Sequence, residues 1–393
     1  MAGGSALIAS SPAHATCDNH DPTTGQTTTC SPPIPDTTRV GAADGSTNVT
    51  VNVLPGAAIN VVNINGIFVH DQSRITNAGT ITVSGNTFDG ITSDLTGNNN
   101  TLINRGMITT TGAFSEGIFT TGAGSALLND NGGTIITQGS DSPGLHSFGG
   151  SGGNNTLTNA GVITTSGDRS SGMQAINFGN LLTNNGTITT TGADAHGLFG
   201  NGNNNTLINN GIINASGANA HGITALGTTL GPITNTGSMT ASGMGGLGAF
   251  IESATTFTNA ASGTIVSKQA TGIIANGGGT FNNAGTITAQ NIGININGGS
   301  GNVTNTGTIT GAVGAGLLFA GNFNNSLFNS GNINGNGTAV QFDTGNDQFT
   351  MADGTVRGIV NMGDGTNTVT MTSGRFMPSL LGIQLRGSHR RGS

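Results

Sequence analysis

The sequence predicts an all-β fold, a right-handed parallel β-helix built from coils of about 25 residues with three strands per coil. The first observation behind this prediction is a unit resembling T-L-x-N-x-G-x-I-T-x-x-G, which recurs in eleven copies with central glycines 22 to 28 residues apart. The second is the alternation of apolar and polar residues around each glycine, which is the period of a half-buried strand. The third is the composition, with 70 Gly in 393 residues and many Thr and Asn, which opposes helix formation.

Each repeat carries three apolar positions, one for each strand of a coil. The earlier strand has its apolar residue four places before the glycine, as at Leu102 and Leu207, and the later strand has it in pairs such as Gly90-Ile91. One coil cannot bury these side chains alone, but coils stacked about 4.8 Å apart cover each with a neighbour of the same kind. We therefore expect a rod. The interior residues of its central strands are Ile81, Ile108, Ile135, Ile163, Ile188, Ile213, Met239, Ile265, Ile287, Ile309 and Ile333.

An asparagine stands two places before most central glycines. Asn tolerates the turn between strands, and its amide can bond to the Asn of the next coil, so a structural stack is a better explanation than an active site. Copies with an insertion, such as Asn259 to Gly263, should widen that corner by about two residues. The predicted column is Asn77, Asn104, Asn131, Asn159, Asn184, Asn209, Asn235, Asn283, Asn305 and Asn329.

The repeats divide the chain into four parts. Residues 1–15 end in small residues that suit signal peptidase, so they are interpreted as the tail of a signal peptide cleaved after Ala15. Residues 16–46 are expected to form an N-terminal cap before the coils, with Cys17 and Cys30 joined in an oxidising compartment rather than used for metal or redox chemistry. The rod is predicted over 47–374, and 375–393 form a basic tail unlike the repeats.

The composition excludes nucleic acid as a partner and disfavours catalysis. The net charge is −7 and Trp and Tyr are absent, so nucleic acid would find neither clustered cations nor stacking platforms. A polysaccharide-cleaving β-helix would need grouped carboxylates. The acidic residues of the repeats are expected to lie in different coil phases, and the prediction is no enzyme and no catalytic residue; these candidates are Asp89, Glu116, Asp168, Asp194 and Glu252.

Two further patterns suggest metal binding, but weakly. His196 and His221 occupy the same place in consecutive coils, with His146 two residues out of that register, and two stacked imidazoles could bind a transition metal. Residues 363–369 resemble one nonapeptide of a calcium-binding β-roll, but Asn367 stands where the ligand Asp belongs and no tandem copies follow. The favoured interpretations are a repeated turn residue and the last coil, so we predict no metal and no cofactor.

The Cys-pair segment, the repeated N-x-G-x-I-T-x-x-G unit and the ending Gly345 to Thr370 resemble passenger domains of bacterial autotransporters, the type V secretion family. The similarity covers about residues 16 to 374. It implies export, passage through an outer-membrane barrel, and display on a Gram-negative cell surface or secretion. The chain departs from the pattern because only 19 residues follow Gly374, too few for a barrel of about a dozen strands.

The leading hypothesis is an adhesin-like, virulence-associated stalk whose Thr and Asn faces contact host surfaces, extracellular matrix, glycans or sister rods. One alternative is a polysaccharide-binding or polysaccharide-cleaving enzyme. A remote alternative is an ice-binding array of Thr-x-Thr pairs, in which Met107, Val162, Ile212, Ser238 and Asn332 interrupt the first column.

Overall fold

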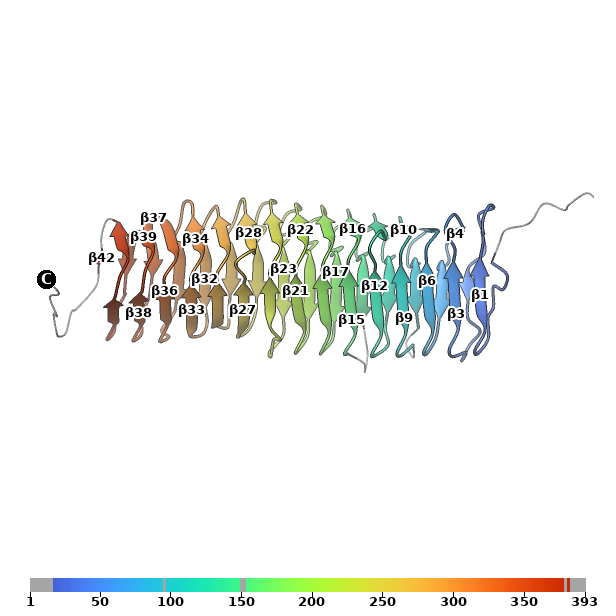
Figure 1. The fold of residues 1–393 in the computed structure, drawn as a ribbon, viewed down its shortest axis with the longest axis horizontal. Coiled ribbons are helices and arrows are strands. Elements are labelled where there is room, and N and C mark those ends of the chain that lie inside the picture. The colour runs from blue at the N-terminus through green and yellow to red at the C-terminus, as the bar shows by residue number, and fades with distance from the viewer. Residues whose placement is uncertain (1–16, 95–96, 149–152, 378–379, 382–393) are drawn as a thin grey trace, which may run out of the picture.

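The computed structural model describes residues 17–94, 97–148, 153–377 and 380–381. The chain forms a parallel β-solenoid of about 13 turns with about 24 residues per turn, which confirms the predicted all-β parallel β-helix. Figure 1 shows the rod, with its N-terminal coils in blue and its C-terminal coils in red. None of the described residues forms a helix that could cross a membrane. The predicted signal-peptide tail, with its cleavage after Ala15, lies outside the described residues.

The strands stack in three columns, here called the first, second and third sheets in the order in which a coil visits them. The first sheet contains β1 (Thr27–Cys30), β3 (Thr50–Val53), β6 (Arg74–Asn77), β9 (Thr101–Asn104), β12 (Ala126–Asn129), β15 (Thr156–Asn159), β18 (Leu181–Asn184), β21 (Thr206–Asn209), β24 (Ile233–Asn235), β27 (Thr255–Asn259), β30 (Gly279–Asn283), β33 (Gly301–Asn305), β36 (Ser326–Asn329), β38 (Gln348–Met351) and β40 (Thr368–Met371). The second sheet contains β4 (Ala58–Val62), β7 (Thr80–Ser84), β10 (Met107–Thr110), β13 (Thr134–Thr137), β16 (Val162–Thr165), β19 (Thr187–Thr190), β22 (Ile212–Ala215), β25 (Ser238–Ala241), β28 (Thr264–Ser267), β31 (Thr286–Ala289), β34 (Thr308–Gly311) and β41 (Arg375–Met377).

The third sheet contains β2 (Val40–Gly41), β5 (Ile67–Val69), β8 (Ile91–Ser93), β11 (Ile118–Thr120), β14 (Leu145–Phe148), β17 (Met173–Ile176), β20 (Leu198–Asn201), β23 (Ile223–Leu226), β26 (Ala249–Ile251), β29 (Ile273–Ala275), β32 (Ile294–Asn297), β35 (Leu317–Ala320) and β42 (Leu380–Leu381). Two long strands, β37 (Asn332–Gln341) and β39 (Thr355–Asn361), pair with both the second and the third sheets.

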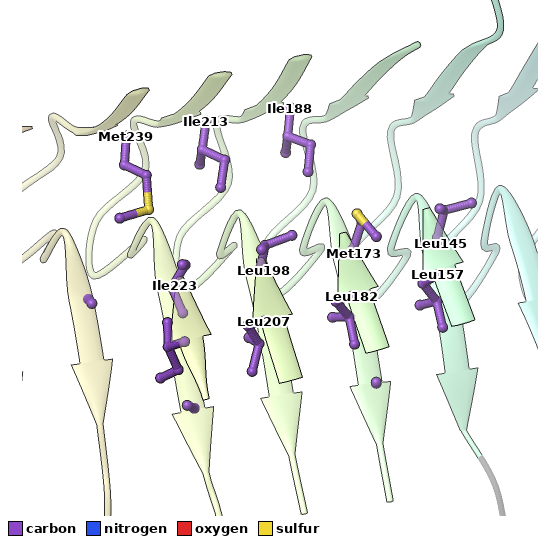
Figure 2. Close-up of a cluster of buried hydrophobic side chains, with 14 of the residues drawn as sticks. Leu145, Leu157, Met173, Leu182, Ile188, Leu198, Leu207, Ile213, Ile223 and Met239 are labelled. Carbon is purple, nitrogen blue, oxygen red and sulfur yellow. The ribbon is translucent and has the colours of Figure 1, made fainter. Parts of the chain in front are cut away.

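The coils stack in register, so the same repeat position lies above itself along the rod. Ile188 pairs with Ile163 on one side and with Ile213 on the other, and all three are 0% exposed. Figure 2 shows such side chains pointing into the space between the sheets. Burying an aliphatic side chain of this size contributes about 1.5–3 kcal/mol. Each coil supplies several of them, which explains how a chain so poor in aromatic residues folds.

The corner between the second and third sheets changes width along the rod. Ten residues separate the interior residue of the second sheet from that of the third in the coils from Ile81–Ile91 to Met239–Ala249, which we call the wide corner. The separation falls to eight at Ile265–Ile273 and to four at Val356–Val360, which we call the tight corner. The corner then becomes so short that one strand runs around it, and this is why β37 and β39 join the two sheets.

The rod extends at both ends beyond the predicted range 47–374, into the predicted cap and the predicted tail. Within the predicted cap 16–46, β1 pairs with β3, Asp36 forms a parallel bridge to Ile59, and β2 pairs with β5, so these elements make a first coil. Within the predicted tail 375–393, β41 and β42 pair with β39. The rest of that tail lies outside the described residues.

Candidate functional site

A continuous ladder of asparagine side chains runs inside the rod. Eleven side chains form it, and each donates from Nδ2 to Oδ1 of the next at 2.7–2.8 Å. The same nitrogens also bond to backbone carbonyls, as Asn209 does to Gly211 at 3.3 Å. Every member is at most 2% exposed, so the ladder satisfies buried amides rather than presenting a site to solvent. Its members are Asn77, Asn104, Asn129, Asn159, Asn184, Asn209, Asn235, Asn259, Asn283, Asn305 and Asn329.

One predicted member of this column was wrong. Asn129, not Asn131, takes the ladder position, and Asn131 is exposed. This coil carries the same two-residue insertion as the coil of Asn259, so the Asn that ends the strand lies four places before the glycine. The strand register, not the distance to the glycine, therefore decides which amide is buried.

A second polar column was missed by sequence reasoning. It lies at the start of the first sheet, where a side-chain oxygen accepts the backbone N–H of the coil before it, as Asn180 Oδ1 does from Asn155 at 3.0 Å. Its sequence signal is the Asn directly before Thr-Leu at Asn155 and Asn205. The buried members are Ser73, Asn100, Ser125, Asn155, Asn180, Asn205, Asn325 and Asp347.

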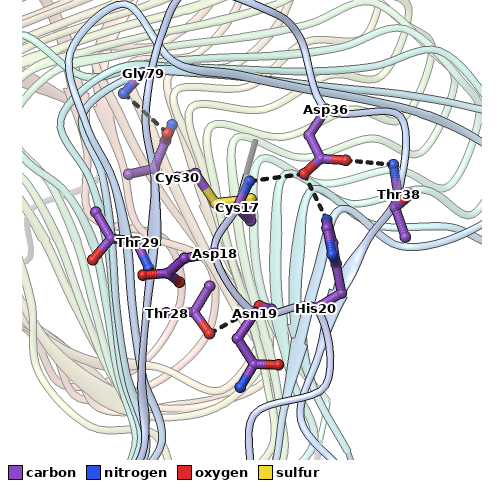
Figure 3. The surroundings of a disulfide bond; sticks show 11 residues. Cys17, Asp18, Asn19, His20, Thr28, Thr29, Cys30, Asp36, Thr38 and Gly79 are labelled. Carbon is purple, nitrogen blue, oxygen red and sulfur yellow. Dashed lines mark hydrogen bonds and ion pairs between the residues drawn. A yellow bond between two sulfur atoms is a disulfide. The ribbon is translucent and has the colours of Figure 1, made fainter. Parts of the chain in front are cut away.

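Cys17 and Cys30 form a disulfide at the N-terminal end (Figure 3). The expectation that both lie before the coils was wrong for Cys30, which ends β1 and stacks on Val53. Asp36 Oδ2 accepts the Cys17 N–H at 2.9 Å and lies 2.6 Å from His20 Nε2. Burial alone would raise the pKa of Asp36, but these hydrogen bonds and one from the Thr38 N–H bring it below its ordinary value. The carboxylate thus fastens the segment around the disulfide to the first coil.

Cys17, His20 and Asp36 also bring three possible metal-ligand atoms within 4.8 Å of one another. The sulfur of Cys17 is committed to the disulfide, which leaves one imidazole and one carboxylate that already bond to each other. Two such groups do not make a closed structural metal site.

Asp89 and Glu116 lie together in the wide corner, which corrects the expectation that the acidic residues are in different coil phases. Both precede the glycine that opens a third-sheet strand, and the Glu116 N–H donates to Asp89 Oδ1 at 2.9 Å. Their side chains also bond to each other. Burial, and then the charge of Glu116, raise the pKa of Asp89 well above its ordinary value, and burial raises the pKa of Glu116. Two carboxyl groups that bond to each other share a proton between them.

A structural rule explains this column. The residue before the glycine needs a side-chain acceptor, because that atom receives the backbone N–H of the corresponding residue in the next coil. Asn65 Oδ1 receives the Asp89 N–H at 2.7 Å, and His196 Nδ1 receives the His221 N–H at 3.1 Å. Glu116 does not follow this rule because the next residue in the column is Pro143, which has no N–H, and Pro143 and Leu247 have no side-chain acceptor to offer.

His146 supplies the N–H donor to Glu116 that Pro143 lacks. Its Nδ1 lies 3.0 Å from Glu116 Oε1, and its Nε2 lies 3.3 Å from the amide nitrogen of Gln174. The amide donates to Nε2, so Nδ1 carries the proton and donates to the carboxylate. Burial lowers the pKa of His146 to about 4, which keeps the ring neutral. His146 lies three residues beyond the position before its glycine, not the predicted two.

His196 and His221 stack with ring centroids 4.9 Å apart. Each Nδ1 accepts a backbone N–H, the second from Leu247 at 3.0 Å, so each neutral ring carries its proton on Nε2. Burial lowers the pKa to about 3 for His196, where His221 adds to the effect, and to about 4 for His221. A transition metal needs an unprotonated ring nitrogen, and neither ring offers one without breaking its backbone bond. This geometry favours the structural interpretation.

The other acidic candidates are separate from this pair and hold backbone groups. Asp168 Oδ1 accepts the Ala193 N–H at 2.9 Å, and Glu252 Oε2 accepts the Gly227 N–H at 2.8 Å. Asp194 has a left-handed backbone, with φ of 53°, at the turn of the wide corner. The five candidates do not come together as one active site.

The outer faces of the rod differ in chemistry. The second sheet presents half-buried threonines in register, such as Thr187 and Thr189, interrupted by Met107, Val162 and Ile212, which are 40–46% exposed. The third sheet presents rings in a row, in which Phe199 packs on His196 at 5.5 Å and Phe250 lies 6.1 Å from His221. These columns are the repetitive surfaces that a partner would meet.

Among the hollows of the described surface, two lie over the first sheet. One of about 330 Å³ is lined by polar residues that include Asn302, Asn324 and Gln348. The other, of about 520 Å³, is lined by Leu230, Pro232 and neighbouring threonines. Neither is lined by Asp89 or Glu116.

The sequence matches no protein-family model, and it has no match among curated proteins or solved structures.

Proposed function

We propose that this chain is the exported stalk of a Gram-negative cell surface, an adhesin-like structural and interaction protein that resembles an autotransporter passenger. The observation that carries the proposal is the continuous rod, in which buried polar columns are satisfied internally while the outer positions of successive coils lie in register. Such a body holds a surface at a distance from its point of attachment.

The repeated surface suits weak, multivalent contacts. An outer column returns about every 4.8 Å, so a polymeric partner can engage several coils at once, and linked weak contacts bind more tightly than any single one. With a charge of only −7 over 393 residues, contact would depend on hydroxyl, amide and aromatic groups. Host surfaces, extracellular matrix, glycans and sister rods are partners of that kind.

The disulfide supports export, because such bonds persist in oxidising compartments. Delivery through an outer-membrane barrel is part of the same proposal. A reading frame that continues from this chain into alternating ten-residue strands would support it.

The polysaccharide-cleaving alternative is less well supported. Asp89 and Glu116 are 6% and 9% exposed, and their hydrogen bonds are used to hold backbone and His146. A reducing-end assay on acidic and neutral glycans should therefore stay flat. The ice-binding alternative requires unbroken Thr columns, and a thermal-hysteresis assay decides it.

The test of the stalk proposal is binding by the intact chain. The purified rod is applied to glycan and matrix arrays and to host cells, and its self-association is followed by sedimentation. We expect binding that falls when Phe199 and Phe250 are both changed to Ser, with the matched change of Thr187 and Thr189 to Ser as the control for the second sheet. A rod that binds nothing on the arrays or cells and stays monomeric contradicts the proposal.

A further inference from the structure

We propose that the turn 342–347 binds a hard divalent cation such as Ca²⁺ through Oδ2 of Asp347 and the backbone carbonyl oxygens of the same turn. The proposal concerns a site near the C-terminal end of the rod and is independent of the adhesin-like function.

Asp347 belongs to the second polar column, between Asn325 and Asn367. In all three residues, Oδ1 does the same thing and accepts the backbone N–H of the coil before. Asn325 Oδ1 accepts from Gly301 at 2.9 Å, Asp347 Oδ1 accepts from Asn325 at 2.8 Å, and Asn367 Oδ1 accepts from Asp347 at 2.9 Å. The side chain of Asp347 is therefore held in the orientation of its asparagine neighbours.

The second polar atom is where Asp347 differs. Asn325 Nδ2 donates to the Phe323 carbonyl at 2.9 Å, and Asn367 Nδ2 donates to the Met362 and Gly363 carbonyls at 2.8 and 3.3 Å. Asn100 and Asn205 do the same in earlier coils, toward the carbonyls of Gly97 and Gly202. In these four coils the column places an N–H donor against a carbonyl of the preceding loop, whereas Asn180 Nδ2 donates to Asn205 Oδ1.

In the coil of Asp347, an oxygen takes the place of that donor. Asp347 is 0% exposed, and its Oδ2 has no hydrogen-bond partner among the described residues. Thr344 aligns with Asp364 in a parallel bridge, so the positions that match Met362, Gly363 and Asp364 are Phe342, Asp343 and Thr344. By this alignment Asp347 brings a carboxylate oxygen to the place where Asn325 and Asn367 bring an N–H donor. Phe342 O already accepts from Gln341 Nε2 and Asp343 O from the Asp364 N–H, so each carbonyl keeps one lone pair for a further partner.

A bound cation supplies a positive charge in place of the N–H donor. Carboxylate and backbone carbonyl oxygens are ligands that Ca²⁺ takes, in flexible geometry. The carboxylate of Asp343, in the same turn, adds negative charge near Asp347. Asn346 and Gln348, the two sequence neighbours of Asp347, line the polar hollow over the first sheet, while Asp347 itself is buried beneath that surface.

The experiment compares the intact wild-type chain with Asp347→Asn. The variant restores an amide donor of nearly the same shape, so it should fold. Thermal unfolding is followed in EDTA and in 5 mM CaCl₂ at matched ionic strength, and CaCl₂ is titrated calorimetrically into each protein. We expect Ca²⁺ to raise the wild-type midpoint by about 2–4 °C and to give saturable heat, because a ligand that binds only the native state stabilises it. Asp347→Asn should show neither effect.

Asp353→Asn is the matched control, since Asp353 is an exposed carboxylate outside the turn. It should respond to Ca²⁺ as the wild type does. A wild-type chain that shows no Ca²⁺-dependent shift and no heat overturns the proposal, because Oδ2 must then satisfy the carbonyls with a proton. An equal response from Asp347→Asn overturns it as well, because the cation would then bind elsewhere.

Discussion

The coils with the wide corner and the coils with the tight corner bury the same three strands in different ways. In a wide corner, ten residues from Ile188 to Leu198 leave room for an added polar layer, in which Thr190 Oγ1 donates to the Ala195 carbonyl at 2.7 Å. In a tight corner, seven residues from Ile287 to Ile294 leave no such room. The interior there is filled by aromatic rings, as where Phe319 stacks on Phe342 at 4.7 Å.

The residue before the glycine also differs between the two regions. In wide corners this column contains Asp89, Glu116, His196 and His221, together with Pro143 and Leu247, and it continues as Thr271, Ile292 and Ala315 in tight ones. Asp89, His196 and His221 each accept a backbone N–H of the next coil. This structural role weakens a catalytic explanation of them.

A charge placed in the shared interior should produce the largest effect. Ile188→Asp buries a carboxylate with no partner, at a cost of about 3–5 kcal/mol or local opening. We expect new proteolytic cuts near residues 180–195, mapped by mass spectrometry. Thr189→Asp, on the outer side of the same strand, is the control and should leave the map unchanged.

Ile309→Asp applies the same test to a tight-corner coil. It should make the residues around β34 susceptible to proteolysis to a similar extent. If it is tolerated while Ile188→Asp is not, the two regions do not share one dry interior.

Opening the disulfide should have the next largest effect, confined to the first coils. Closing a loop of 13 residues stabilises the folded state by up to ~3 kcal/mol in the chain-entropy model. Reduction, or Ser at both positions, should leave the far-UV circular dichroism spectrum nearly intact and increase proteolysis before residue 60 and end-to-end association. Unchanged proteolysis would show that Asp36 and its hydrogen bonds hold this end without the disulfide.

The asparagine ladder crosses both regions, so breaking it should cost a similar amount in each. Asn209→Ala and Asn305→Ala each leave a buried amide of the preceding coil without its acceptor, at about 1–3 kcal/mol in urea-induced unfolding. Asn210→Ala is the control, because its amide bond to Asn185 is exposed and should matter little. A loss at Asn210 equal to that at Asn209 would mean that burial does not set the strength of these bonds.

Acid should affect the wide corner selectively. His196 and His221 have pKa values of about 3 and 4 when folded and 6.5 as the ordinary value, so they take up protons on unfolding. Their contribution is complete above pH 6.5 and is lost as the pH falls, by up to about 1.4 kcal/mol per pH unit for each ring. The raised pKa of Asp89 acts in the opposite sense.

The double variant His196→Asn, His221→Asn isolates the histidines, because Asn65 shows that an Asn oxygen serves the same acceptor role. Between pH 7 and pH 5 the urea midpoint should fall more for the wild type than for the variant. Parallel pH curves would show that these rings are protonated in the fold.

The sequence could predict the repeat, the three interior positions and most of the ladder, because a short period repeats the same side-chain environment. It could not show that Asn129 replaces Asn131, since register depends on strand pairing across an insertion. The contact of Asp89 with Glu116 was missed although the sequence carries a signal for it, because each directly precedes the glycine of a Gly-Ile pair in consecutive coils. The place of Cys30 was missed because the first coil, with β2 only two residues long, lacks the repeat signature.

The asparagine ladder also gives the molecule an electrical direction. Adjacent strands in a parallel sheet exchange backbone hydrogen bonds in both senses, but every ladder amide donates toward the C-terminal end, from Asn77 to Asn329. The side-chain dipoles therefore add, from Asn77, whose Oδ1 accepts the Gly79 N–H, to Asn329, whose Nδ2 faces the sulfur of Met351. Each folded coil presents a polarised Nδ2 donor to the coil that follows it in the sequence. We therefore expect the stack to grow from its N-terminal end toward its C-terminal end.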